Sequence, residues 1–232
     1  MARRFCDETD SRRLLNPGPV TLVSVAFRDE RNAAPVAWAM PLSMEPPLVG
    51  VALHPERHTT DMVRAAQEFA INIPGPAMLK QVHFLGSHSG RDVNKLEAAS
   101  IEWFPGMRVG APLLDGCLAW IECTVRDSIR FPDHTLFVGE VVRVQALEEA
   151  YAGGWLLEDP KYCPLTYLGG DEYAVIQDKR EAAIQTTMQG GLVLETAEER
   201  EEREEREAQK AEAKGAEGDE GYAEMRRFLG RD

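Results

Sequence analysis

The sequence predicts a mainly β domain, an antiparallel barrel or sandwich with helices inserted between its strands, followed by an acidic tail. Runs rich in Val and Ile, bounded by turn residues, dominate the first two thirds of the chain. After Val175 the composition changes to Glu, Arg, Lys and Ala with few apolar residues. We therefore place the folded domain in residues 1–178 and a tail, helical or disordered, in residues 179–232.

Five strands and two helices are expected in the domain. Apolar residues recur on one side of Thr59–Phe69 and of Ala77–Leu85, which predicts a helix in each segment. Because both helices lie between strand-like runs, we expect them to cover an edge of the sheet. The expected strands are residues 19–27, 35–43, 47–54, 117–126 and 136–147.

The tail carries pairs of opposite charge four residues apart that support a helix, such as Glu199 with Arg203 and Glu202 with Arg206. Its EER triplet repeats every three residues and has no apolar stripe, so it cannot form the seam of a coiled coil. Residues 195–232 include 14 acidic and 8 basic side chains, a net charge of -6. A solvated single helix or a disordered segment is the expectation.

The formal net charge of the whole chain is -13. Nucleic acids and anionic membranes both require a basic face, so neither is expected as a partner. A phosphorylated ligand would need a local cationic pocket. The first residues lack the apolar run of a secretory signal, and no apolar segment approaches the roughly 20 residues of a membrane span, so we expect a cytoplasmic protein.

The cysteines and histidines do not predict a metal site. The four cysteines have no CxxC spacing, and Cys117 and Cys123 are expected as buried thiols because an extended strand keeps them too far apart to bridge. His54 and His58 are four residues apart, but Pro55 opens a turn and HPERH is not the HExxH of a zinc protease helix. Nucleotide-binding glycine loops and a GxSxG elbow are missing.

The stretch HPERHTTDMV, residues 54–63, gathers a cation and two hydroxyls where a turn runs into a helix. The first amide groups of a helix are unpaired and its dipole favours negative charge, so this is a candidate anion site. Arg57 offers a bidentate cation, and Thr59 and Thr60 offer hydroxyl donors, a set that suits a phosphate monoester. In the alternative interpretation a threonine only caps the helix and Arg57 is solvated.

Four segments occur in an order that resembles a known family: NPGPVTLVSV, then RNAAPVAWAMPLSMEPPLVGVAL leading into HPERHTT, then SHSGRDVNKLE, and finally DHTLFVGEVV followed by PLTYLGGDEY. The chain is similar to the flavin reductase-like family of FMN-binding split barrels, and most to its flavoredoxin-type members. The resemblance covers roughly Arg12 to Val175. It implies an antiparallel FMN-binding split β-barrel with flanking helices.

The resemblance assigns five residues to the phosphate of FMN: Arg57, Thr59, Thr60, Ser89 and Lys95. A solvated helix lysine is the alternative for Lys95. Two positions beside it depart from the family pattern, because Asn94 stands where relatives usually carry Asp and Leu96 where they usually carry Phe.

The strand after Asn32 resembles the one that passes the isoalloxazine ring in the family. Backbone groups of Val36, Ala37 and Trp38 are implied to meet the polar edge of the ring. Relatives more often carry small hydroxyl residues near Val36 and Ala37, so the ring contacts should be mainly through the main chain. Asn32 and Trp38 flank this strand, and ordinary core is the alternative for Trp38.

Two further residues follow from the resemblance. His134, in FPDHTLF, is implied to face the open side of the flavin, where the nicotinamide stacks, although a lone histidine is usually a surface or satisfied polar residue. Tyr167, in PLTYLGG, corresponds to an aromatic residue that packs near the cofactor, and its hydroxyl needs a partner if it is buried. Gly169 and Gly170 require only a turn.

The implied function is that of an NAD(P)H:flavin oxidoreductase, in which NADH or NADPH gives hydride to FMN and electrons pass to flavin or another acceptor. The family's split barrels are commonly homodimers with the cofactor near the subunit interface. Two alternatives stay open. One is a non-enzymatic, flavoredoxin-like electron carrier, and the other is a reductase component recruited to a monooxygenase by its acidic tail.

Overall fold

The computed structural model describes residues 3, 5–176, 178–180, 182–186, 192–196, 198–206 and 208–209 of the 232-residue chain. Contacts between Cα atoms divide the chain into two compact units, Met1–Gln177 and Asp178–Asp232. Within the described residues, no helix is both long enough and apolar enough to cross a membrane.

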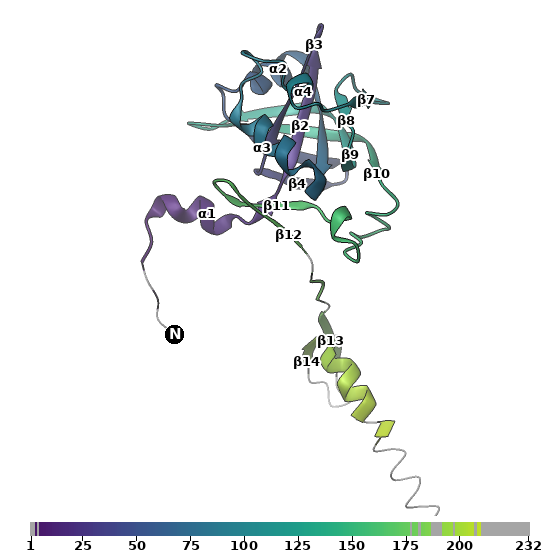
Figure 1. The fold of residues 1–232 in the computed structure, drawn as a ribbon. Coiled ribbons are helices and arrows are strands. Elements are labelled where there is room, and N and C mark those ends of the chain that lie inside the picture. Colours follow the sequence, from purple (N-terminus) through teal and green to yellow (C-terminus); the bar gives the residue numbers. More distant parts are fainter. Residues whose placement is uncertain are drawn as a thin grey trace, which may run out of the picture. The chain divides into compact units, whose positions relative to one another are not determined.

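Strands are the commonest regular element of the first unit (Figure 1). In chain order they are β1 (Gly18–Pro19), β2 (Thr21–Phe27), β3 (Glu30–Val36), β4 (Ala39–Met44), β5 (Pro47–Leu53), β6 (Glu68–Pro74), β7 (Trp103–Pro105), β8 (Pro112–Leu114), β9 (Cys117–Arg130), β10 (Thr135–Ala146), β11 (Leu165–Gly169) and β12 (Glu172–Val175). A seven-stranded antiparallel sheet has the order β3-β2-β6-β9-β10-β5-β4, and smaller sheets join β1, β11 and β12, and β7 with β8. The predicted mainly β, antiparallel fold is confirmed.

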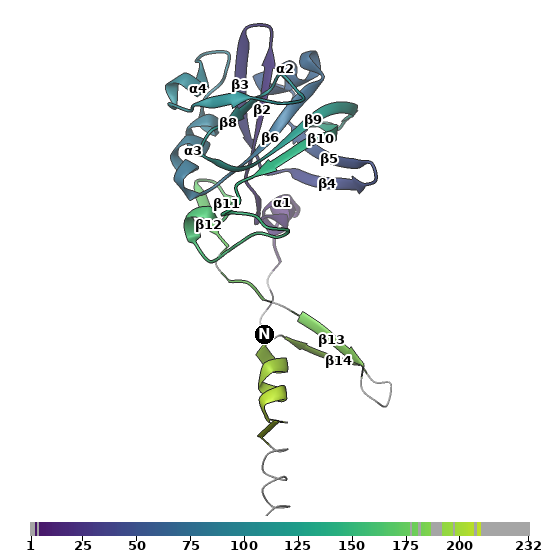
Figure 2. The same ribbon diagram turned by 90° about the vertical axis from the view of Figure 1, so that its right-hand side faces the viewer.

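Helices lie before and between these strands. They are α1 (Ser11–Leu15), α2 (His58–Ala66), α3 (Leu79–Ser87) and α4 (Lys95–Ala98), with 3-10 turns at Glu8–Asp10, Pro76–Met78 and Pro160–Tyr162. Helix α2 packs against β2 and β6, whereas α3 and α4 pack against β3 (Figure 2). The sheet is therefore covered by helices near its β3 edge.

Apolar side chains pack on both faces of the sheet. Alternate residues of β2 point to opposite sides, so this strand contributes to both clusters. On one face Val23 and Val25 pack in a buried cluster with Phe69 and Phe137. On the other face Leu22 belongs to a second cluster, to which α3 and α4 add Val82, Leu85 and Leu96. Full burial of each such side chain contributes about 2 kcal/mol, so both clusters hold the helices on the sheet.

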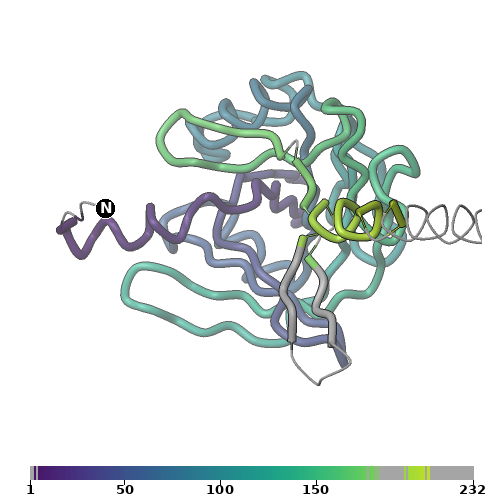
Figure 3. The backbone as a smooth tube through the Cα atoms, turned by 90° about the horizontal axis from the view of Figure 1, so that it is seen from below, coloured from purple at the N-terminus to yellow at the C-terminus, as the bar shows by residue number. Residues whose placement is uncertain are grey.

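The two edges of the seven-stranded sheet are consecutive in the chain. Strand β3 ends at Val36 and β4 begins at Ala39, so only Ala37 and Trp38 connect the edges. In a flat sheet these edges would be roughly 29 Å apart, and two linking residues span only about 11 Å. The sheet must therefore curl into a barrel with its seam at this link, a curvature that can be followed in Figures 2 and 3.

The predicted strand at residues 35–43 is wrong, because this segment contains the end of β3, the link across the seam and most of β4. Strand β3 starts at Glu30, and its Asn32 and Ala33 are buried beneath the helices. The ERNAA stretch has no alternation of large apolar and polar residues, so the sequence pattern did not reveal it. The other four predicted strands correspond to β2, β5, β9 and β10.

The predicted helix Thr59–Phe69 is placed correctly but is too long. Helix α2 ends at Ala66, where Gln67 adopts a left-handed conformation with φ of 57°. Phe69 lies in β6, a strand that the sequence analysis missed because both of its faces are buried and it shows no polar alternation. The predicted helix Ala77–Leu85 is confirmed as a 3-10 turn followed by α3, which continues to Ser87. The prediction that Cys117 and Cys123 are buried thiols is also confirmed.

A buried carboxylate fixes the loop before β8. One oxygen of Glu122, in β9, accepts hydrogen bonds from the amides of Arg108 and Val109 at 2.6 and 3.1 Å. The Glu122 side chain and Val109 are both buried, so the Val109 amide has no alternative partner in water, whereas Arg108 is exposed. Gly110, on the same loop, donates from its exposed amide to a carboxylate oxygen of Glu68, in β6, at 2.7 Å.

Replacing Glu122 by Ala should lower the free energy of unfolding by about 1 to 3 kcal/mol, because the buried amide of Val109 loses its acceptor. Glu68→Ala is the matched control and should cost less than about 1 kcal/mol, since water can replace its carboxylate. Urea denaturation followed by tryptophan fluorescence measures both. Equal losses in the two variants would contradict this role for Glu122.

The second unit contains a hairpin of β13 (Ala182–Thr186) and β14 (Leu192–Thr196), followed by helical residues 198–206 and 208–209. The Thr196 hydroxyl accepts from the Glu199 amide at 3.2 Å, and a Glu199 carboxylate oxygen accepts from the Thr196 amide at 2.8 Å. This reciprocal pair starts the helix. The predicted pair of Glu202 and Arg206 is present at 2.7 Å. The hairpin was not predicted, and residues 210–232 of the expected tail lie outside the described residues.

Candidate functional site

A cavity of about 540 Å³ opens at the seam of the barrel, beside the N-terminus of α2. Its cations are Arg57 and Lys95, and its carboxylate is Glu56. On a chain with a net charge of -13, it forms a local cationic pocket that suits an anion. The lining residues are Asn32, Ala34, Pro35, Val36, Ala37, Trp38, Ala52, Leu53, His54, Glu56, Arg57, His58, Thr59, Gly86, His88, Ser89, Gly90, Lys95 and His134.

The start of α2 presents donors to this cavity. Arg57 is the N-cap residue, with an extended backbone and no side-chain cap, so the alternative that a threonine caps the helix is wrong. Thr59 is buried and lines the cavity. Within the described residues, Arg57 is exposed and makes no ion pair, which leaves its guanidinium available to a ligand.

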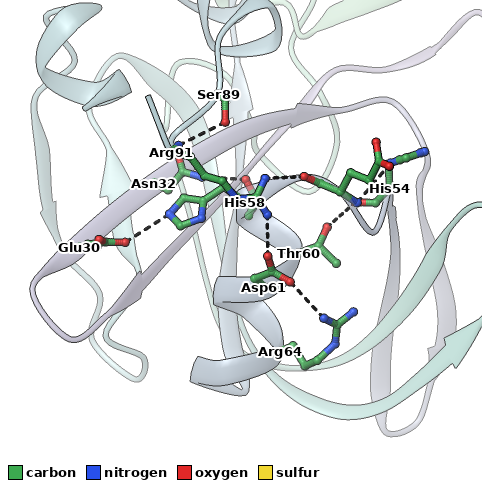
Figure 4. A network of polar contacts seen from close by, with 11 residues as sticks. Glu30, Asn32, His54, His58, Thr60, Asp61, Arg64, Ser89 and Arg91 are labelled. Carbon is green, nitrogen blue, oxygen red and sulfur yellow. Dashed lines mark hydrogen bonds and ion pairs between the residues drawn. The ribbon is translucent and has the colours of Figure 1, made fainter. Parts of the chain in front are cut away.

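Thr60 does not reach the cavity. Its hydroxyl donates to the carbonyl of His54 at 2.7 Å, and its amide donates to the carbonyl of Arg57 at 3.0 Å. The side chain is fully buried. The implied contact of Thr60 with the phosphate is therefore corrected: this hydroxyl bonds to the carbonyl of His54 (Figure 4) and so closes the turn before α2.

The side-chain amide of Asn32 forms a buried hydrogen bond with Thr59. Its Nδ2 donates to Oγ1 of Thr59 at 2.8 Å, and the side chain is 2% exposed. Gly90 packs against the same amide so closely that a Cβ atom there would lie 2.7 Å from Oδ1 of Asn32. Only glycine leaves room for the loop at residues 88–90 to close over Asn32.

Lys95 brings a second cation to the cavity from the first turn of α4. Its side chain is 4% exposed, and Nζ donates to the carbonyl of Leu85, near the end of α3, at 2.9 Å. Burial, together with the nearby charge of Arg57, lowers the pKa of Lys95 to about 8. The alternative of a solvated lysine is therefore wrong.

Arg91 ties the two donor segments together (Figure 4). Its guanidinium donates to the carbonyl of Glu56 and to the carboxylate of Asp61 in α2, each at 2.6 Å. The backbone amide of Arg91 donates to Oγ of Ser89 at 3.2 Å. One side chain thus holds the loop that carries Ser89 against the turn that carries Arg57.

Aromatic rings also line the cavity. The ring of His134 lies 4.5 Å from that of Trp38, measured between centroids, and 5.5 Å from that of His54, which it meets edge-on. Nδ1 of His134 is 3.2 Å from a carboxylate oxygen of Asp133, and this contact holds the pKa of Asp133 below its ordinary value. Trp38 is 43% exposed, so the alternative that it belongs to the core is wrong.

The arrangement joins an anion site to a surface for planar groups. The same cavity is lined by donors from α2 and α4, by the rings of Trp38 and His134, and by residues 35–37. Such a cavity suits a ligand that combines a phosphate with an aromatic system.

Comparisons with known proteins agree with this geometry. A family model described as a flavin reductase like domain matches residues 12–174. The chain belongs to this family. An uncharacterised protein of Pyrococcus abyssi is 36% identical over 72% of this chain and 95% of its own length. An NADH:FMN oxidoreductase of Rhodococcus erythropolis is 29% identical over 66% of this chain and 79% of its own length.

Two solved structures resemble this flavin reductase-like domain. An FMN-binding protein of Thermus thermophilus, determined with bound 1-cyclohex-2-enone, has a TM-score of 0.66 and 31% identity, covering 77% of this chain and 98% of its own. A flavoredoxin of Methanosarcina acetivorans has a TM-score of 0.68 and 25% identity, covering 77% and 94%. The family and its split-barrel fold agree with the resemblance found in the sequence.

The flavin reductase-like domain brings nine of the eleven predicted site residues to one cavity, all except Thr60 and Tyr167. Tyr167 lines an adjoining cavity of about 340 Å³ that shares Val36, Ala37 and Arg57 with the first. Its hydroxyl donates to the carbonyl of Gly170 at 3.2 Å, within the turn predicted at this position.

The two departures from the family pattern beside Lys95 keep the local structure. The side chain of Asn94 accepts a hydrogen bond from the amide of Glu97 at 3.4 Å and so caps α4, as an aspartate would. Leu96 is buried in the apolar cluster beneath α3. Neither substitution moves Lys95 out of the cavity.

Sequence reasoning missed several residues of the site. Four of the five histidines line the cavity, namely His54, His58, His88 and His134, but only the last was predicted. Among the described residues, no group of His, Cys, Asp and Glu side chains is arranged to hold a metal ion. His54 and His58 lie on either side of Arg57, where the turn leads into α2. Their position beside the predicted phosphate donors could have indicated that they line the cavity.

Proposed function

We propose that this domain binds FMN at the seam of its barrel and acts as an NAD(P)H:flavin oxidoreductase that passes electrons to a further acceptor. The observation that carries the proposal is the donor set of Arg57, Thr59 and Lys95 in a cavity of an otherwise acidic chain. The names of the Thermus and Rhodococcus relatives support the flavin and the nicotinamide donor. A cytoplasmic location, where reduced nicotinamide cofactors are available, is part of the proposal.

The residues present fit the phosphate of FMN. A phosphate monoester carries close to two negative charges at neutral pH and has three strong acceptor oxygens. Two cations, the Thr59 hydroxyl and the free amides at the start of α2 complement these charges and acceptors. Ser89, whose hydroxyl accepts a hydrogen bond from the Arg91 amide, lines the same cavity.

Bound FMN would supply the hydride-accepting atom N5, while the protein supplies binding, orientation and electrostatics. Arg57 and Lys95 would neutralise the phosphate, and the backbone of Val36 and Ala37 would contact the polar edge of the ring. Trp38 and His54 hold the ring of His134 from two sides. Because Nδ1 of His134 faces Asp133, its Nε2 is the atom available to the nicotinamide.

Changing His134 to Ala should lower the rate constant for flavin reduction by NAD(P)H about tenfold, the cost of one positioning hydrogen bond, while FMN affinity stays the same. His134→Gln keeps an N–H donor and should recover part of the rate. Stopped-flow absorbance under anaerobic conditions measures the rate. Unchanged reduction in His134→Ala would make the histidine a bystander, and loss of FMN would assign it to the flavin's own shell.

We propose a homodimer that uses the exposed edge strand β4. This strand is at the end of the seven-stranded sheet and exposes Met40, Leu42 and Met44, the last at 95%. An exposed apolar edge invites pairing with another chain. Sedimentation equilibrium should give twice the mass of one chain, and Met44→Lys combined with Leu42→Lys should shift the equilibrium toward monomer.

The alternatives differ in one measurement. Anaerobic mixing of the FMN-loaded protein with NADH, and separately with NADPH, should bleach the visible flavin band within seconds if the protein is a reductase. A flavin band that persists with both donors but disappears with a chemical reductant would favour the non-enzymatic carrier. A reductase that gives electrons to a monooxygenase only when residues 179–232 are present would favour the recruited component.

A further inference from the structure

The amide of Asn32 makes one hydrogen bond within the site, and that bond determines how Thr59 can bind a ligand. Nδ2 of Asn32 donates to Oγ1 of Thr59 at 2.8 Å, and both side chains are 2% exposed. A hydroxyl has one proton to donate and lone pairs to accept. Because Asn32 occupies a lone pair of Thr59, the proton of Thr59 must point elsewhere.

The cavity is where that proton is available. Thr59 lines the cavity, and among the described residues none accepts a hydrogen bond from its hydroxyl. Thr60, the next residue, has its hydroxyl committed to the carbonyl of His54. Thr59 is therefore the threonine of this turn whose proton is left for a ligand.

The other end of the same amide indicates that Asn32 is held for its N–H group. Oδ1 of Asn32 is shielded from solvent and has no hydrogen-bond partner. Gly90 lies against it, so the loop that covers the cavity also fixes the orientation of the amide. Buried acceptors are rarely left unpaired, and this one is explained if the amide serves to polarise Thr59.

We propose that Asn32 is a positioning residue that fixes the Thr59 hydroxyl as a donor toward the anion in the cavity, an inference that rests on the proposed function. Asn32 then acts through Thr59 and does not itself contact the flavin. With the Thr59 hydroxyl fixed as a donor, the site favours an ionised phosphate, which accepts hydrogen bonds, over a ligand group that would donate a proton to Thr59.

A double-mutant cycle on the full chain tests this inference. Thr59→Val and Asn32→Leu are made singly and together, and FMN and riboflavin affinities are measured by quenching of flavin fluorescence. Each single variant should lose about 10- to 100-fold in FMN affinity, the usual range for a hydrogen bond to a charged group. The double variant should bind FMN within about threefold of Thr59→Val alone, because Asn32 has no effect without the hydroxyl.

Two further variants separate positioning from a structural effect. Asn32→Asp keeps the shape but accepts the proton of Thr59, so FMN affinity should fall below that of Asn32→Leu while riboflavin affinity changes by less than about threefold. Asn72→Ser is the matched control, because its buried amide is fully bonded to Leu22, Ser24 and Leu114 away from the cavity. It should lower stability without changing the ratio of FMN to riboflavin affinity. Asn32→Ser also removes the amide and replaces Asn32→Leu if that variant does not fold.

The results distinguish a failure of the role of Asn32 from a failure of the proposed flavin binding. Additive losses in the cycle, or equal losses of FMN and riboflavin affinity, would overturn the role of Asn32 while leaving flavin binding intact. A parent protein that binds neither flavin would refute the proposed function and the inference with it. Non-additive losses confined to FMN support the inference.

Discussion

Replacing Arg57 by Met is expected to weaken FMN binding by about 10- to 100-fold, while riboflavin binding changes by less than about threefold. The guanidinium lines the cavity beside Thr59 and, within the described residues, has no ion pair that competes with a ligand. FMN and riboflavin differ only by the phosphate, so the ratio of their affinities isolates the contribution of that group. Titrations followed by flavin fluorescence provide both constants.

Arg64 offers a matched control on the same helix. It is about half exposed, pairs with Asp61 at 3.2 Å and does not line the cavity. Arg64→Met should leave both affinities unchanged, because its charge is screened by solvent and by its partner. If Arg64→Met weakens FMN as much as Arg57→Met does, general charge rather than a bound phosphate explains the effect.

The parts of the fold that were predicted from sequence are those with a local signal. Strands β2, β5, β9 and β10 carry long runs of Val, Ile and Leu, and the start of α2 follows a recognisable turn. Strand β6 was missed because it is buried on both faces, so its pattern matches the neighbouring helix as well as a strand. The link at Ala37 and Trp38 carries no local signal, since it exists only because the sheet curls and brings β3 and β4 close enough for two residues to connect them.

The site shows the same division between local and tertiary information. Arg57, Thr59 and Lys95 could be named because they stand in short motifs. The hydrogen bond from Arg91 to Asp61 joins residues 30 positions apart, and neither segment carries a sequence pattern that predicts it. Thr60 was wrongly placed at the ligand because a sequence shows that a hydroxyl is present, but not which acceptor reaches it first. Here the His54 carbonyl does.

The affinity for FMN should fall as the pH rises above about 8, because of Lys95. Burial and the charge of Arg57 lower the pKa of its amine from 10.5 to about 8. A bound phosphate favours the charged amine, so the pKa must rise when FMN binds. Between these two values binding takes up a proton, and the affinity falls by up to about tenfold for each pH unit.

The stability of the unliganded protein should change in the opposite direction. In the unfolded chain Lys95 has its ordinary pKa of 10.5, so between about pH 8 and 10.5 the folded state binds fewer protons than the unfolded state. The free energy of unfolding therefore rises with pH in this window, with an upper limit of about 3 kcal/mol from this group. Below about pH 8 the amine is charged in both states and the dependence disappears.

Three variants assign both trends to a single amine. Lys95→Met removes the titrating group, so FMN binding should be weaker and nearly independent of pH between about pH 7 and 9. Lys95→Arg keeps a charge that does not titrate in this range and should also give a flat profile. Lys80→Met, on the exposed side of α3 and outside the cavity, should keep the full dependence of the parent. A pH dependence that survives in Lys95→Met would show that a group other than Lys95 takes up the proton.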